Sequence, residues 1–125
     1  MNIRKNTGKN AIFVGADANG NNVIISNNTK GKPAFIAGAN DEDNGYMKTI
    51  NTNGKNATLT GSKKDGTGYV TTFSSSGDRA AYISSDRSGN GIMGLYDKNQ
   101  KLQWSQKGVK QAVEKTTDTD DNKDK

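Results

Sequence analysis

Glycine and apolar positions recur along this chain every 23 residues, from about residue 8 to residue 105. Gly8, Gly31, Gly54 and Gly77 mark the period most plainly, and other small and apolar residues repeat with the same spacing. A fixed period of this size is typical of stacked copies of one supersecondary unit, each burying its apolar face on its neighbours. The pattern therefore predicts an extended repeat structure and not a domain built around one pocket.

Each repeat is predicted to hold two strands and two turns. Residues 68–74 are rich in β-branched and aromatic side chains, as expected of a strand. Residues 75–78 form a turn, residues 79–83 a second strand, and residues 84–91 a longer polar connection to the next unit. Gly8, Gly31, Gly54 and Gly77 are predicted turn glycines, and Gly31, Gly54 and Gly77 are expected at positive φ, where a side chain would be penalised.

The repeat core is predicted to form from two sets of columns, where a column is the set of residues that occupy the same position in successive 23-residue repeats. The second strand alternates a small with a large residue on one side, and the first strand has an apolar column with apolar neighbours. The expected core residues are Ala11, Phe13, Ala34, Ile36, Ala57, Leu59, Ala80 and Tyr82, with Ile24, Met47, Val70 and Met93. Adjacent apolar columns suggest that the first strand is covered on both sides, by its own sheet and by a partner chain. The alanine column has two readings: close approach near a symmetry axis, or a fit between two large neighbours.

The composition favours self-association. Leu, Ile, Val and Phe contribute 19 of the 125 residues, which is little for a core, and the chain has no cysteine and no histidine. Small domains with such weak cores are commonly completed by disulfides, metals or oligomerisation, and oligomerisation is what remains here. We expect a parallel homotrimer, because parallel stacking keeps each 23-residue layer in register between chains.

The chain divides into three expected regions. Residues 1–7 form an N-terminal arm, 8–105 the β-repeat shaft of about four units, and 106–125 a short helix followed by a charged flexible tail. The helix is suggested by the i, i+3, i+4 spacing of Val109, Ala112 and Val113. The candidate anchor is the basic start of the chain, namely Arg4, Lys5 and Lys9.

No catalytic, cofactor or metal constellation is predicted, so the chain is expected not to be an enzyme. Without His or Cys, the usual nucleophile pairs cannot form. The acidic run Asp41-Glu42-Asp43 is either an oxygen-ligand cation site or, as we expect, a solvated turn. Tyr46 and Tyr69 are candidate ligand contacts that could stack on sugars, although at repeat-core positions we expect them to be packing residues.

Charge and hydropathy limit the classes of partner and the cell compartments that we expect for this chain. The net charge of +5 is spread around the repeat, which indicates a solvated surface and not a specific nucleic-acid site. No stretch approaches the roughly 20 apolar residues of a membrane span. The basic first residues are not followed by a signal-peptide core of about 7–15 apolar residues, so we expect no ordinary cleaved signal.

The glycine turns and short strands of residues 91–99 and 52–55 resemble the repetitive β-structured fibres of bacteriophage virions. The resemblance is one of repeat style. It implies an all-β chain stacked into an elongated β-solenoid or β-prism shaft, intertwined with two other copies. It also implies a non-enzymatic virion protein, a short fibre or decoration on the phage head or tail, assembled in the host cytoplasm with other virion proteins. The alternative is a module of a phage or bacterial adhesin that binds carbohydrate or a cell surface, with a host glycan as partner.

Overall fold

The strands of this protein form one antiparallel sheet, as seen in a computed structural model that describes residues 1–108. The strands are β1 (Asn2–Arg4), β2 (Asn10–Ala16), β3 (Asn22–Asn27), β4 (Pro33–Ala39), β5 (Gly45–Ile50), β6 (Asn56–Ser62), β7 (Gly68–Phe73), β8 (Arg79–Ser85), β9 (Gly91–Tyr96) and β10 (Leu102–Lys107). The predicted all-β class is confirmed. The helix expected around residues 109–115 lies outside the described residues.

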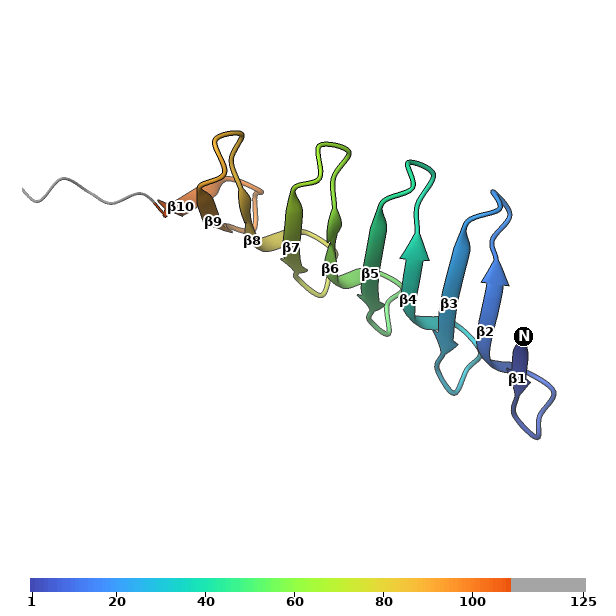
Figure 1. Cartoon of the computed structure of the whole chain (residues 1–125). Coiled ribbons are helices and arrows are strands. Elements are labelled where there is room, and N and C mark those ends of the chain that lie inside the picture. The colour runs from blue at the N-terminus through green and yellow to red at the C-terminus, as the bar shows by residue number, and fades with distance from the viewer. Residues whose placement is uncertain (109–125) are drawn as a thin grey trace, which may run out of the picture.

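The sheet is an open meander in which each strand pairs with the next strand in sequence, from β1 to β10. Alternate turns lie along two opposite edges of the sheet, as Figure 1 shows. The expectation of a β-solenoid is therefore wrong for the single chain, because neighbouring strands are joined by hairpins and not by successive coils. Residues 2–4, which were expected to lie in a separate arm, pair with β2 as the first strand of the sheet.

All nine hairpin turns have the same backbone form. In the second turn the Asp17 N–H donates to the Asn21 carbonyl, and the Gly20 N–H donates to the Asp17 carbonyl. This pattern is a type I turn followed by a left-handed residue, a standard three-residue hairpin loop. Gly31, Gly54 and Gly77 have the predicted positive φ, as has Gly8, and the four values lie between 77° and 92°.

The turns reveal a half-repeat that the 23-residue period conceals. Their first residues follow one another at steps of 12 and 11, so Gly20, Gly66 and Gly89 are equivalent to the four predicted turn glycines. These three glycines also have φ between 82° and 88°. The predicted long connection over residues 84–91 is wrong, because residues 84–85 continue β8 and a turn of ordinary size follows.

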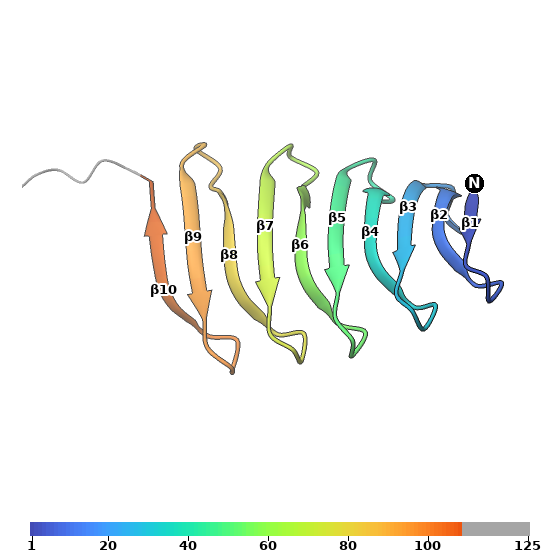
Figure 2. The same cartoon turned by 90° about the horizontal axis from the view of Figure 1, so that it is seen from below.

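The alanine column explains the difference between 11 and 12 residues. Pairing between β7 and β8 runs from Thr72 opposite Ala81 to Phe73 opposite Arg79, which leaves Ala80 as an extra residue. The same register shift occurs in the corresponding hairpins, and its extra residues are Ala11, Ala34, Ala57 and, in β10, Gln103. Such β-bulges bend and twist a strand. The even-numbered strands curve near the edge of the sheet where turns join β1 to β2, β3 to β4 and so on to β9 and β10 (Figure 2). The column thus marks a bulge.

Residues 1–108 of a single chain form almost no interior. Among the described residues only Val23 is a buried hydrophobic side chain, with 4% of its surface exposed. The expected core residues Ile24, Met47, Val70 and Met93 are 43–49% exposed, so within one chain they lie on the surface. Phe13, Ile36, Leu59 and Tyr82 are half-buried on the opposite face of the sheet. The reason is geometric: a single sheet has two faces and no second layer to cover either of them.

Candidate interaction surfaces

One face of the sheet carries an unbroken row of side chains, which we call the aliphatic row. Its residues lie opposite one another on successive strands from β2 to β9: Val14, Ile24, Ala37, Met47, Thr60, Val70, Ile83 and Met93. At about 4.8 Å per strand the row is about 34 Å long. Ile83 is 51% exposed, and Leu95 and Trp104 add exposed apolar surface beside the row. A contiguous patch of this kind marks a contact surface more often than a solvated face.

The opposite face, which we call the tyrosine face, carries all four tyrosines. Registers place Tyr46 and Tyr69 on either side of Gly61, and Tyr82 between Thr71 and Gly94. Alternation along each strand puts Tyr96 on the same side as Gly94. The two candidate ligand tyrosines, Tyr46 and Tyr69, are thus half-buried in a row of alternating large and small residues.

The small residues of that row are required by close approach of the backbone. A Cβ on Gly61 would lie 2.7 Å from the Gly45 carbonyl oxygen and 3.1 Å from the Tyr46 Cβ. Gly15 and Gly38 occupy equivalent positions on β2 and β4. Glycine therefore lets the backbone of the neighbouring strand approach closely at Gly38 and Gly61, and at Gly15 it makes room for the Phe13 ring of the same strand.

Tyr82 is the centre of a cluster of aromatic rings and cations. Lys63 Nζ donates to Tyr82 Oη at 2.9 Å and lies 5.4 Å from the centre of the Tyr82 ring. The Arg79 guanidinium carbon lies 5.7 Å from the Tyr82 ring and 5.4 Å from the Tyr96 ring. Burial acts to raise the pKa of Tyr82, but the hydrogen bond from Lys63 and the nearby positive charges outweigh it, so the pKa is lowered.

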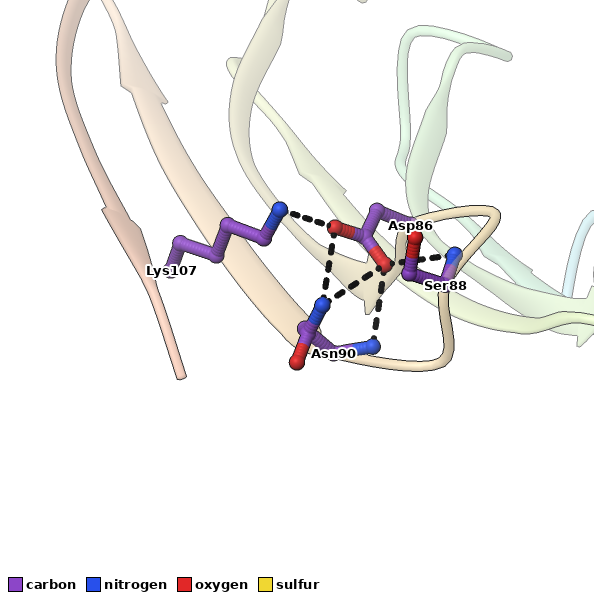
Figure 3. Close-up of polar contacts among 4 residues, drawn as sticks. All are labelled: Asp86, Ser88, Asn90 and Lys107. Carbon is purple, nitrogen blue, oxygen red and sulfur yellow. Dashed lines mark hydrogen bonds and ion pairs between the residues drawn. The ribbon is translucent and has the colours of Figure 1, made fainter. Parts of the chain in front are cut away.

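The turn before β9 is tied to the edge strand β10 by an ion pair. Asp86 Oδ1 accepts from the backbone N–H groups of Ser88 and Asn90, and Asp86 Oδ2 lies 2.5 Å from Lys107 Nζ (Figure 3). The hydrogen bond with Lys107 and those from the turn lower the pKa of Asp86 far below its usual range. Six turns begin with an Asp or Asn that accepts two backbone N–H groups in this way: Asp17, Asn28, Asn40, Asn51, Asp86 and Asp97. Sequence reasoning missed this cap, although an Asp or Asn three residues before four of the seven turn glycines was its signal.

The acidic run Asp41-Glu42-Asp43 forms the middle of the fourth turn, where Asp43 takes the glycine position with φ 59°. The Asp41 carboxylate accepts hydrogen bonds from the side-chain amides of Asn19 and Asn21, on the neighbouring turn of the same edge. Within residues 1–108 no group of three or more acidic side chains is placed to hold a metal ion.

The candidate anchor residues are not equally free. Lys5 Nζ donates to the Asn28 carbonyl at 3.1 Å and so links the first and third turns. The Lys9 side chain passes close to Gly31, whose Cβ would lie 3.2 Å from Lys9 Cδ. Arg4 is exposed on β1. The structure therefore brings Lys5 and Lys9 against the third turn and leaves Arg4 on the edge strand.

Comparisons with known proteins leave the family open. No protein-family model matches the sequence, and no curated protein matches it. In the described part of the chain, no helix has the length and apolar character needed to cross a membrane. A proposal for the function of this chain therefore depends on the aliphatic row and the tyrosine face.

Proposed function

We propose that this chain is a non-enzymatic structural protein that self-associates through the aliphatic row, as a short trimeric fibre or decoration of a phage particle. The observation that carries the proposal is the pairing of two facts. A row across eight successive strands is apolar except at Thr60, with five of its side chains 43–51% exposed, and residues 1–108 contain a single buried hydrophobic side chain.

Covering the row supplies the burial that one chain lacks. Apolar surface removed from water contributes roughly 25 cal/mol per Å², whereas ordering each residue costs about 1–2 kcal/mol of backbone entropy. A sheet with both faces open recovers little of that cost. A second and third copy on the aliphatic row would bury Met47, Val70 and Met93, which are nearly half exposed in one chain.

A parallel trimer suits the direction of the row. The row crosses the strands, so three copies can place their rows along one common axis with identical residues meeting in each layer. In that β-prism arrangement the tyrosine faces point away from the axis. The bulges and the nine uniform turns hold each sheet in one shape, which favours a shaft.

The assignment to a virion rests on the resemblance in repeat style to phage fibres. We propose that the basic start of the chain, with Arg4 and Lys9, contacts an acidic particle surface, and that the other end points outward. Three copies of each charge would add through multivalency.

Fractionation of particles from the lysed source culture tests this role. We expect an antibody to this protein to detect it in the density band that contains the particles, and to detect less of the Arg4→Gln/Lys9→Gln variant there. Lys98→Gln, which changes an exposed turn lysine at the far end of the sheet, is the matched control. Recovery of the wild-type protein only in the soluble fraction would contradict the virion role.

A further inference from the structure

Charge is distributed unequally between the strands and the turns. The four charged residues in the strands are all basic, namely Arg4, Lys48, Arg79 and Lys107. The eight acidic residues of the described chain lie in turns: Asp17, Asp41, Glu42, Asp43, Asp65, Asp78, Asp86 and Asp97. The tyrosine face therefore has no strand carboxylate of its own to neutralise its cations.

Arg79 and the turn residue Lys63 both lie against Tyr82, and neither has a carboxylate oxygen of the described residues within 4.0 Å. Within residues 1–108 the one ion pair closer than 4.0 Å joins Lys107 to Asp86. Lys63 and Arg79 instead contact Tyr82: Lys63 donates a hydrogen bond to its hydroxyl, and the Arg79 guanidinium lies over its ring. Cations held on aromatic rings are fixed in direction while their charge stays available to an anion.

The tyrosine face is hollowed on both sides of Tyr82. One hollow of about 340 Å³ is lined by Leu59, Lys63, Tyr69, Thr71, Phe73, Arg79 and Tyr82. A second of about 350 Å³ shares Tyr82 and is lined also by Gly94, Tyr96 and Lys107. The positions 23, 46 and 69 residues before Gly94 are Thr71, Lys48 and Ile25. At Gly94 a Cβ would lie 2.8 Å from Leu102 Cδ1, so the glycine makes room for the Leu102 side chain that lines the second hollow.

We propose that this pair of hollows binds an acidic saccharide, with its carboxylate or sulfate held by Lys63 and Arg79 and its ring faces against Tyr82 and Tyr96. Aromatic rings beside a few directed polar groups, in hollows of 300 Å³ or more, are what small-ligand sites commonly provide. Arg and Lys bind such anions through charge-assisted hydrogen bonds. The site goes beyond the structural role and lies within one chain, on the face left open by assembly through the aliphatic row.

The surrounding charges favour a saccharide over single-stranded nucleic acid. A nucleic-acid groove needs positive charge along the whole backbone. Here the flanking turns alternate in sign, with Lys64 beside Asp65 and Arg87 beside Asp86, so they offer no continuous positive track for successive phosphates. An acidic saccharide can place one anionic group between the two cations and its less charged remainder on the rings.

Fluorescence anisotropy with labelled oligosaccharides tests the site in the full chain. The probes are digalacturonate, a hyaluronan tetramer and sialyllactose, each with one or two carboxylates, and the matched neutral ligand is methyl-esterified digalacturonate. We expect at least one acidic probe to bind, tenfold or more weaker binding to Arg79→Gln and Lys63→Gln, and less than a twofold change for Lys32→Gln, an exposed turn lysine. The methyl ester should not bind.

Two further variants keep the test independent of folding and of assembly. Arg79→Lys retains the charge and should retain most of the binding, and Tyr82→Phe should weaken binding because it releases Lys63 from its hydroxyl partner. Circular dichroism and sedimentation of each variant separate a binding defect from a folding or assembly defect. Failure of all three acidic probes, an equal loss in Lys32→Gln, or tighter binding of a thymidine oligonucleotide than of every acidic saccharide would overturn the proposal.

Discussion

At the scale of single residues, three kinds of glycine serve different purposes in this sheet. Gly54 lies in a turn at φ 77° with open space around its missing Cβ, whereas Gly61 has an extended backbone and a carbonyl oxygen in the way. Gly91 has neither constraint. The 23-residue period identified the first kind from sequence, since turn glycines recur by rule. The period could not show that glycine is required at Gly61 and not at Gly91, because close approach between strands depends on the pairing register.

Alanine substitutions should separate these three roles. Gly54→Ala should lower the free energy of unfolding by about 1 kcal/mol through its left-handed backbone. Gly61→Ala should lower it by about 1–3 kcal/mol, because its Cβ would meet fixed backbone. Gly91→Ala should be neutral or slightly stabilising. Urea denaturation followed by circular dichroism measures all three, and equal effects would show that the register assigned to β5 and β6 is incorrect.

At the scale of elements, the hairpin is the unit of this protein, and the first residue of its turn is the main local signal. Asp and Asn occur interchangeably at that position because either side chain can accept the two backbone N–H groups. Sequence reasoning located strands at 68–74 and 79–83 close to β7 and β8. The predicted unit of two strands and two turns is the exact repeat, because only the even-numbered strands carry the bulge. Sequence reasoning missed that the two turns of each unit have the same form, since Asp43 takes the glycine position in one of them.

Asp86→Asn should keep the turn and break the ion pair that holds β10. Its amide oxygen can still accept from Ser88 and Asn90, as Asn28 and Asn51 do in their turns. Amide hydrogen exchange in β10 should therefore become faster at neutral pH, while exchange in β2 and β3 stays unchanged. Unchanged protection of β10 would show that Lys107 contributes nothing to the edge strand.

The pH dependence of the same contact has a definite sign. The pKa of Asp86 is lowered in the folded chain. Its contribution to the stability of the fold is therefore fully present above the unfolded pKa of about 3.9. That contribution is lost as the pH falls through the lower folded pKa. Wild-type protein should therefore lose stability below about pH 4 more steeply than Asp86→Asn. Parallel acid-unfolding curves for the two proteins would contradict this account.

At the scale of the whole molecule, the sequence specified an all-β repeat and left its topology open. A 23-residue unit with two strands can be stacked as the coils of a solenoid or unrolled as hairpins. The choice depends on whether each strand pairs with its neighbour in sequence, which periodicity alone does not report. The adjacent apolar columns did indicate two apolar faces, and the structure places them on the aliphatic row and the tyrosine face.

The central claim is that the aliphatic row is an interface between copies of this chain, and sedimentation equilibrium tests it most directly. At micromolar concentration the wild-type protein should have three times the 13.3 kDa mass of one chain. Met47→Lys/Val70→Lys should shift the equilibrium toward smaller species, because two cations per chain would be buried along the shared axis. Thr52→Lys, in an exposed turn, should remain trimeric. A wild-type protein that is monomeric, folded and unaffected by the two substitutions would contradict the claim.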